Sequence, residues 1–325
     1  MIYRLLRWFT GIALHWFYSS IQVIGRERIP ANGPVILAAS HHNALVDALI
    51  AGWIAPRRLT FTAKATLMDN AFLAWLFPLV GVVPLRRVKD EVGRGGERVP
   101  DVARNASAFV NILDVLEKGG MILIFPEGIS HSNSEMAPLK TGVSRLALEA
   151  RDKRQIRNLQ IIPVGLNFED KGNPGTAVLA EVGEPILMDT TGSAVTVDEL
   201  TAMVANRLAA VSLKRPEPSP DRDAVKRKGG VHPLASPLGA WGELTHRYIV
   251  NYARDLALQR SRTPDEPAML TIIYSLILIL VSYVVQFAIV TALFNPLVAG
   301  LYVATLPLGA YWAAFRNHPA RASYA

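Results

Sequence analysis

The chain has 325 residues with a formal net charge of +7, and half of its residues are hydrophobic. Its length suits one large domain or two smaller ones, and its basic balance favours an anionic partner: nucleic acid, an acidic membrane surface or a phosphorylated substrate. The absence of cysteine excludes disulfides, thiolate metal sites and a cysteine nucleophile.

The first 24 residues are apolar and aromatic, with Arg4 and Arg7 near the start and Trp8 and Trp16 within the run. A signal peptide would need a small-residue cleavage site after a compact apolar stretch, and none follows. Tryptophans in such a run are typical of an interfacial segment. We therefore expect residues 1–24 to form a membrane-interfacial helix, with a packing helix of the core as the alternative.

Short β-rich runs alternate with helical stretches between residues 25 and 213, which predicts one α/β layered domain. The strand-like runs are Val35–Ala38, Leu59–Thr62, Gly81–Leu85, Met121–Phe125, Leu159–Val164 and Ala177–Val182. The helical stretches are Ala44–Ile54, Asn70–Val80, Val102–Glu117 and Val143–Arg151. A further helix should run from Thr196 to about Leu213, because Glu199 stands at the capping-box spacing from Thr196.

Residues 214–230 are rich in proline and charge and have almost nothing to bury. Their lysines and arginines either rest on anionic headgroups or are simply solvated. We assign residues 214–268 as a whole to a basic linker and amphipathic segment.

Two charge-free apolar runs follow, at residues 269–294 and 297–314, separated by an Asn-Pro pair. The first is long enough to span a bilayer, so residues 269–314 predict a transmembrane hairpin. Arginines flank the hairpin on both sides, at Arg254, Arg260, Arg262, Arg316 and Arg321. The positive-inside rule then places both flanks, and the α/β domain, in the cytoplasm. A buried hairpin of a soluble protein is the alternative.

The first candidate for chemistry is the segment of residues 40–50, SHHNALVDALI. Asn43 suits the N-cap of the helix that starts at Ala44, which leaves His42 just before the helix and Asp47 in its second turn. From there the His42 ring can fold back toward the carboxylate, as a general base requires. By itself this spacing is weak, and His41 is the other candidate base.

Three more segments carry candidate groups. An apolar strand runs into Pro126-Glu127-Gly128, a turn that presents a carboxylate and backbone N–H groups at a strand's end. Arg86 and Arg87 follow another strand and suit phosphate binding. Lys140 precedes a helix N-terminus, which also favours anions.

In this order the segments resemble the glycerolipid acyltransferase family, which contains glycerol-3-phosphate and lysophosphatidic acid acyltransferases. The family's H-x4-D block matches His42 and Asp47, and its Gly-led strand ending in arginine matches Gly81 to Arg87. Its F-P-E-G block matches Phe125 to Gly128, and its apolar run into proline matches the stretch from Ile161 through Pro163 to Val164. The combination covers about residues 30 to 170 and is highly specific.

The resemblance implies that His42 deprotonates an acceptor hydroxyl while Asp47 fixes the imidazole. The oxygen then attacks the thioester of acyl-CoA or acyl carrier protein, which serve as co-substrates; no metal and no cofactor is expected. Arg86, Arg87 and Lys140 would hold the acceptor phosphate, and Glu127 and Gly128 would shape its pocket, with Glu127 bonding a glycerol hydroxyl. The partners so implied are a lipid membrane, the acyl donor and a phosphorylated glycerol-type acceptor, at the inner membrane.

One departure from the family pattern concerns the acceptor. Many lysophosphatidic acid acyltransferases continue the third block as E-G-T-R, whereas Glu127-Gly128 is followed here by Ile-Ser-His. This continuation looks more like the branch that acylates glycerol-3-phosphate or dihydroxyacetone phosphate. An acyltransferase for the sn-2 hydroxyl of lysophosphatidic acid or another lysophospholipid is the alternative.

Rival classes fit less well. A serine hydrolase would need a G-x-S-x-G elbow, and the run from Gly128 to Ser132 lacks the second glycine. A nucleic-acid-binding protein would explain the charge but not the four blocks, so no nucleic-acid partner is expected. A catalytically silent scaffold would not need His42, Asp47 and Glu127 intact.

Overall fold

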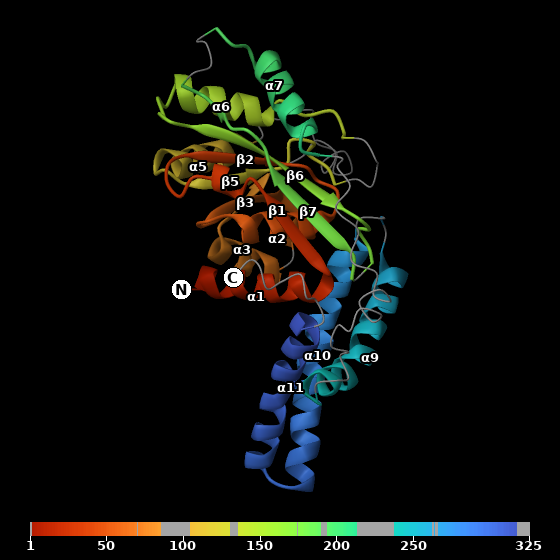
Figure 1. Cartoon of the computed structure of the whole chain (residues 1–325). Helices are drawn as coiled ribbons and strands as arrows, with labels where there is room; N and C mark the ends of the chain where they lie inside the picture. The colour runs from red at the N-terminus through yellow and green to blue at the C-terminus, as the bar shows by residue number, and fades with distance from the viewer. Residues whose placement is uncertain are drawn as a thin grey trace.

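A computed structural model describes residues 2–69, 71–85, 105–130, 136–173, 175–189, 194–212, 237–261, 263 and 266–316 (Figure 1). The strands are β1 (Ser20–Ile24), β2 (Val35–Ala39), β3 (Leu59–Lys64), β4 (Val82–Leu85), β5 (Met121–Ile124), β6 (Gln160–Phe168), β7 (Ala177–Val182) and β8 (Ile186–Leu187). The α-helices are α1 (Ile2–Phe17), α2 (Ala44–Ile54), α3 (Ala71–Val80), α5 (Ala106–Glu117), α6 (Gly142–Asp152), α7 (Val197–Ala209), α9 (Pro237–Arg260), α10 (Pro267–Leu293) and α11 (Pro296–Arg316).

The strands form one mixed sheet in the order β1-β7-β6-β2-β5-β3-β4, with β8 paired to β6. β2 lies at the centre and runs parallel to both neighbours, β5 and β6. The antiparallel pairs are β6 with β7 and β6 with β8. Because β2 and β5 are parallel neighbours, both strands end at the same edge of the sheet.

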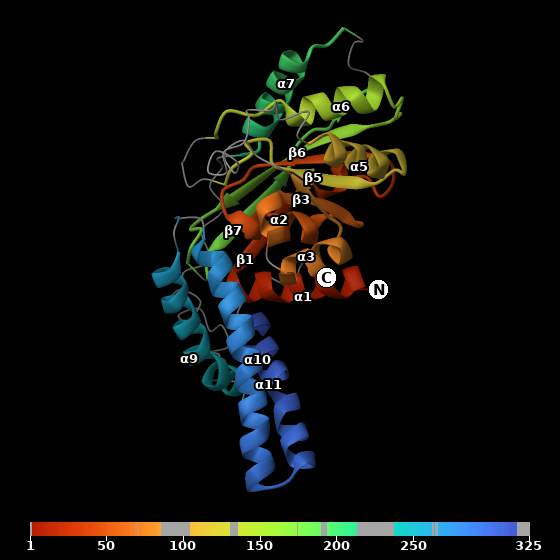
Figure 2. The same cartoon turned by 180° about the vertical axis from the view of Figure 1, so that it is seen from behind.

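Helices cover both faces of the sheet, so each face has its own hydrophobic core (Figures 1 and 2). Alternate residues of β2 belong to different cores: Leu37 joins the one under α1 and α2, and Ile36 the one under α5, α6 and α7. All five residues of β2 are buried, as expected of a central parallel strand with both faces covered. The predicted α/β layered domain is therefore confirmed.

Most predicted elements are present with small shifts at their ends. The helix Ala44–Ile54 and the strand Ala177–Val182 have the predicted bounds. The capping box is formed, since Thr196 Oγ1 accepts from the Glu199 N–H and the Glu199 carboxylate accepts from the Thr196 N–H. Residues 214–230 lie outside the described part of the chain, and so do Arg262 and Arg321.

The prediction of a single helix over residues 1–24 was wrong at its C-terminal end. The helix ends at Phe17, and Ser20–Ile24 form β1, which pairs in parallel with β7. Ile21 and Val23 pack against the core, so alternate residues point to it. A strand is marked by apolar residues at every second position, and this run is too short for that alternation to stand out beside the preceding helix.

The C-terminal helices α10 and α11 form the predicted hairpin, and the chain turns between them at residues 294–295 (Figure 1). By length and composition both helices could cross a membrane. The first turns of α10 belong to the α/β unit, because Ala268 is fully buried and Ile272 packs against the same core as α2. The start of the hairpin is therefore packed into the core of the domain and is not joined to it by a linker alone.

Candidate functional site

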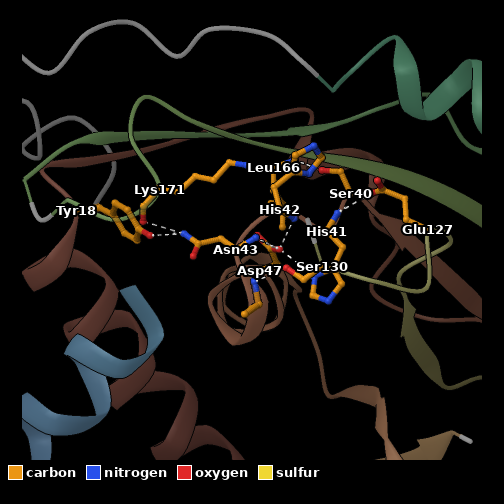
Figure 3. Close-up of polar contacts among 11 residues, drawn as sticks. Tyr18, Ser40, His41, His42, Asn43, Asp47, Glu127, Ser130, Leu166 and Lys171 are labelled. Atoms are coloured by element: carbon orange, nitrogen blue, oxygen red, sulfur yellow. Dashed lines mark hydrogen bonds and ion pairs between the residues drawn. The ribbon is translucent and has the colours of Figure 1, made fainter. Parts of the chain in front are cut away.

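Two of the four sequence blocks meet at the edge of the sheet where β2 and β5 end (Figure 3). Residues 40–43 follow β2 and lead into α2, and residues 125–130 follow β5. Direct hydrogen bonds join the two loops: the His41 N–H donates to Glu127 Oε1 over 2.8 Å, and the Ala44 N–H donates to Ser130 Oγ over 3.0 Å. The carboxyl ends of adjacent parallel strands are a common place for an active site.

Asp47, in the first turn of α2, accepts the bonds that hold the first loop and is fully buried. Its Oδ2 accepts from the N–H groups of His42 (2.7 Å) and Asn43 (2.6 Å), and it lies 3.0 Å from Nδ1 of His41. The carboxylate therefore holds the backbone of the turn and one imidazole ring together.

The ring that contacts Asp47 is that of His41, and the expected contact of the His42 ring with Asp47 was wrong. Side chains of consecutive residues leaving a strand point to opposite sides, and Figure 3 shows the His42 ring on the other side of the turn from Asp47. His42 contributes its backbone N–H to the carboxylate instead. The His41 ring also stacks on Phe125, with 3.9 Å between ring centroids. The catalytic role of His42 stays a proposal.

The turn into α2 is strained and is held from outside the helix. Ala44 has φ +44°, a left-handed conformation that costs a residue other than glycine roughly 1–3 kcal/mol. Asn43 is the N-cap residue of α2, as the sequence predicts, but its side chain forms no cap bond. Ser130, from the loop after β5, accepts the Ala44 N–H in its place. The F-P-E-G loop therefore shapes the turn that carries the histidines.

Asn43 uses its side chain to tie the turn to two segments that sequence reasoning missed. Its Nδ2 donates to the hydroxyl of Tyr18 over 3.0 Å and to the carbonyl of Lys171 over 3.1 Å. Burial, followed by the nearby charge of Asp47, raises the pKa of the Tyr18 phenol well above its usual range, so the hydroxyl stays uncharged. The Lys171 side chain extends toward the His42 side of the turn (Figure 3).

Glu127 is buried, and both of its carboxylate oxygens accept hydrogen bonds from backbone N–H groups. Oε1 accepts the His41 N–H over 2.8 Å, and Oε2 accepts the Ala137 N–H over 3.0 Å. These bonds fix the histidine turn against the segment that leads to Lys140. The predicted bond from Glu127 to a glycerol hydroxyl stays a prediction, and both carboxylate oxygens already hold the loops in place.

Glu127→Gln is expected to lower the free energy of unfolding by about 1–3 kcal/mol, because an amide NH2 group would face one of two N–H donors. Urea unfolding in detergent, followed by circular dichroism, measures the change. Glu117→Gln is the matched control: Glu117 pairs with Arg154 on the surface, and its loss should change stability by less than about 0.5 kcal/mol. Equal stability of Glu127→Gln and the wild type would contradict the bridging role.

Gly128 and Lys140 lie in direct contact. Gly128 has φ +71°, and a Cβ placed on it would come within 2.9 Å of Lys140 Cδ and 3.2 Å of Nζ. Glycine is favoured there because the backbone is left-handed, and a Cβ would in addition displace the end of the lysine side chain. The structure thus brings the exposed Lys140 to the Glu127 loop, as the sequence predicts.

The other predicted phosphate ligands, Arg86 and Arg87, lie outside the described residues. They follow β4, which sits at the far edge of the sheet beside β3. Within the described ranges, no three His, Asp or Glu side chains are grouped so as to hold a metal ion.

The sequence of residues 20–167 matches the family model described as Acyltransferase. Over 163 residues the chain is 28% identical to glycerol-3-phosphate O-acyltransferase 2 of Saccharomyces cerevisiae, covering 46% of this chain and 21% of the relative. Over 151 residues it is 31% identical to the 1-acyl-sn-glycerol-3-phosphate acyltransferase of the same yeast, covering 44% and 42%. This part of the chain matches an acyltransferase-family domain, and the resemblance predicted from the four blocks is confirmed.

The chain spans less than half of the length of these relatives. Among solved structures, the 1-acyl-sn-glycerophosphate (LPA) acyltransferase PlsC from Thermotoga maritima aligns with a TM-score of 0.48 and 20% identity. That alignment covers 65% of this chain and 78% of PlsC.

Proposed function

We propose that the chain is a membrane-bound acyltransferase that moves a fatty acyl group from acyl-CoA or acyl carrier protein to a hydroxyl of glycerol-3-phosphate or dihydroxyacetone phosphate. The observation that carries the proposal is the direct bonding of the H-x4-D loop to the F-P-E-G loop, through His41 with Glu127 and Ala44 with Ser130. Segments about 85 residues apart in sequence thus form one polar site. Of the relatives named above, one is described as a glycerol-3-phosphate O-acyltransferase and the other as a 1-acyl-sn-glycerol-3-phosphate acyltransferase.

In the proposed reaction the His42 imidazole takes the proton of the acceptor hydroxyl, whose oxygen then attacks the thioester carbonyl. The tetrahedral intermediate collapses with cleavage of the C–S bond, and the imidazolium returns the proton to the leaving thiolate. Asp47, fixed by the His42 and Asn43 N–H groups, supplies a negative charge beside the turn that favours the imidazolium. Those two N–H groups are occupied, so donors for the oxyanion must come from elsewhere.

His41 is the second candidate for the base, on one specific observation. Its Nδ1 lies 3.0 Å from Asp47, and stacking on Phe125 holds its ring. A histidine with one nitrogen fixed by a carboxylate has the arrangement of a general base. The H-x4-D spacing favours His42 as the base, and the contact with Asp47 favours His41. The activities of His42→Ala and His41→Ala decide between the two.

For the acceptor phosphate we propose Lys140, together with Arg86, Arg87 and the loop at Gly128. Lys140→Ala is expected to raise KM for the phosphorylated acceptor by roughly tenfold or more, because a hydrogen bond to a charged group contributes about 1.5–3 kcal/mol. The measurement is initial rate against acceptor concentration. Lys153→Ala, which removes an exposed lysine beyond α6, should leave KM unchanged. An unchanged KM in Lys140→Ala would contradict phosphate binding by this residue.

For the membrane we propose that the hairpin spans the bilayer and that α1 lies at its surface. From Leu276 to Leu293, α10 covers about 18 residues or roughly 27 Å, close to the thickness of the hydrocarbon core. Figures 1 and 2 show α1 lying crosswise to the hairpin, at the base of the domain. Trp8 and Phe9 of α1 and Trp75 of α3 are exposed there, as interfacial aromatic residues would be. The domain would face the cytoplasm, at the inner membrane.

The proposal is tested by acyl transfer with purified, detergent-solubilised protein. Labelled palmitoyl-CoA and palmitoyl-carrier protein are each offered with glycerol-3-phosphate, dihydroxyacetone phosphate, lysophosphatidic acid and neutral lysolipids. Ester product on glycerol-3-phosphate or dihydroxyacetone phosphate supports the proposed acceptor. Product on lysophosphatidic acid alone would support the sn-2 enzyme instead.

A further inference from the structure

Helix α9 packs along the membrane hairpin, a position that its assignment to a linker and amphipathic segment did not predict. In both Figure 1 and Figure 2 it runs beside α10 and α11 below the α/β domain. Its buried residues Gly239, Gly242, His246, Ala253 and Ala257 fall mainly at intervals of three, four and seven, which place them along one side of a helix. That side faces the hairpin.

Helices α9 and α11 are in close backbone contact at two glycines. A Cβ on Gly242 would come within 2.0 Å of the Gly309 carbonyl oxygen, and one on Gly309 within 3.1 Å of the Gly242 nitrogen. Helices in membranes associate through small residues of this kind, because they have no hydrophobic driving force between them. Gly300, on the same helix α11, has open space around its Cβ position.

Polar side chains of α9 find their partners on the hairpin. Trp241 Nε1 donates to Thr305 Oγ1 over 3.1 Å, and His246 Nε2 lies 2.8 Å from the Tyr283 hydroxyl. These contacts satisfy groups that would be costly to leave unpaired in hydrocarbon. They also fix the position of α9 along the hairpin. Tyr283 lies near the middle of the stretch of α10 that spans the bilayer in the proposed function.

The outer side of α9 is apolar and aromatic. Leu244, Tyr248 and Tyr252, spaced four residues apart, are 65%, 76% and 61% exposed. On the hairpin itself, Val284 is 69% exposed. Toward its C-terminal end the helix returns to the domain, because Arg254 donates to the Asn173 side chain in the β6–β7 loop.

We propose that the N-terminal half of α9, from about Trp241 to Tyr248, lies within the bilayer, so that three helices rather than two form the membrane unit. The partner of the Leu244–Tyr248–Tyr252 stripe is then the lipid. Trp241 lies 13 residues from Arg254 along the helix, which places it about 20 Å below the domain. Glu243 and Arg247 are neighbours one turn apart, and the long Arg247 side chain can extend toward the headgroups.

This inference rests on the proposed insertion of the hairpin, and one experiment separates the two. The chain has no cysteine, so single substitutions Leu244→Cys, Val284→Cys and Lys153→Cys each give one site for bimane labelling. The full-length variants are reconstituted in phosphatidylethanolamine–phosphatidylglycerol vesicles with or without lipid that carries a doxyl quencher at mid-chain. The expected result is loss of fluorescence at position 244 comparable to that at position 284, with none at position 153 on the domain.

Quenching at position 284 without quenching at position 244 would overturn the inference and leave the hairpin in the membrane. Absence of quenching at both position 244 and position 284 would overturn the inference and the proposed insertion together. Because Leu244 and Val284 are both well exposed on the protein, shielding by neighbouring side chains does not separate them.

Discussion

His42→Ala is expected to lower kcat by about 10²–10⁴-fold, the range that a positioned acid–base group contributes. The substitution removes the imidazole but keeps the backbone N–H that Asp47 Oδ2 accepts. The turn should therefore persist, and the thermal midpoint should change little. Initial rates with saturating acyl donor and acceptor, together with thermal unfolding, measure both quantities.

His41→Ala is the matched control, one residue away. It removes the ring contact with Asp47 and the stack on Phe125, and keeps the N–H bond to Glu127. Its main cost should fall on stability, at about 1.5–3 kcal/mol for a hydrogen bond to a charged group. Full activity in His42→Ala with a large loss in His41→Ala would move the base to His41 and contradict the assignment.

Asp47→Asn should lower kcat by roughly 10²-fold or more, the lower end of what an acid–base group contributes, because it removes the negative charge proposed to favour the His42 imidazolium. An asparagine Oδ1 can still accept the N–H groups of His42 and Asn43, so the variant removes the charge with little change in shape. The measurement is kcat together with the urea midpoint.

Asp47→Ala shows how much of the effect comes from the hydrogen bonds of Asp47 and how much from its charge. It removes the acceptor as well as the charge and leaves buried N–H groups without a partner, which costs about 1–3 kcal/mol of stability. We expect the alanine variant to be less stable than the asparagine variant and at least as inactive. An active Asp47→Asn enzyme would mean that Asp47 serves only to hold the turn.

The sequence predicted the domain well because its signals are local. Central strands such as β2 are continuous apolar runs, and the Thr196–Glu199 capping box depends on residues three apart. The strand β1 was missed because its sheet partner β7 lies 157 residues away along the chain. A five-residue strand with so distant a partner leaves little trace in the local pattern.

At the site, spacing identified the residues and only the fold revealed their contacts. The H-x4-D pattern selects His42 and Asp47, but which ring meets the carboxylate depends on the direction in which β2 ends. Tyr18, Ser130 and Lys171 join the turn from three other segments, with no spacing to mark them. Helix α9 was missed as a packing element because its partners are two later helices.

The most direct test of the account is the balance between thiol released and ester formed. Purified protein is given palmitoyl-CoA with and without glycerol-3-phosphate, and CoA thiol, glycerol ester and free fatty acid are quantified. For acyl transfer we expect one ester per thiol, release that depends on the acceptor, and loss of both products in His42→Ala. Release of thiol with free fatty acid regardless of acceptor would indicate a hydrolase and contradict acyl transfer.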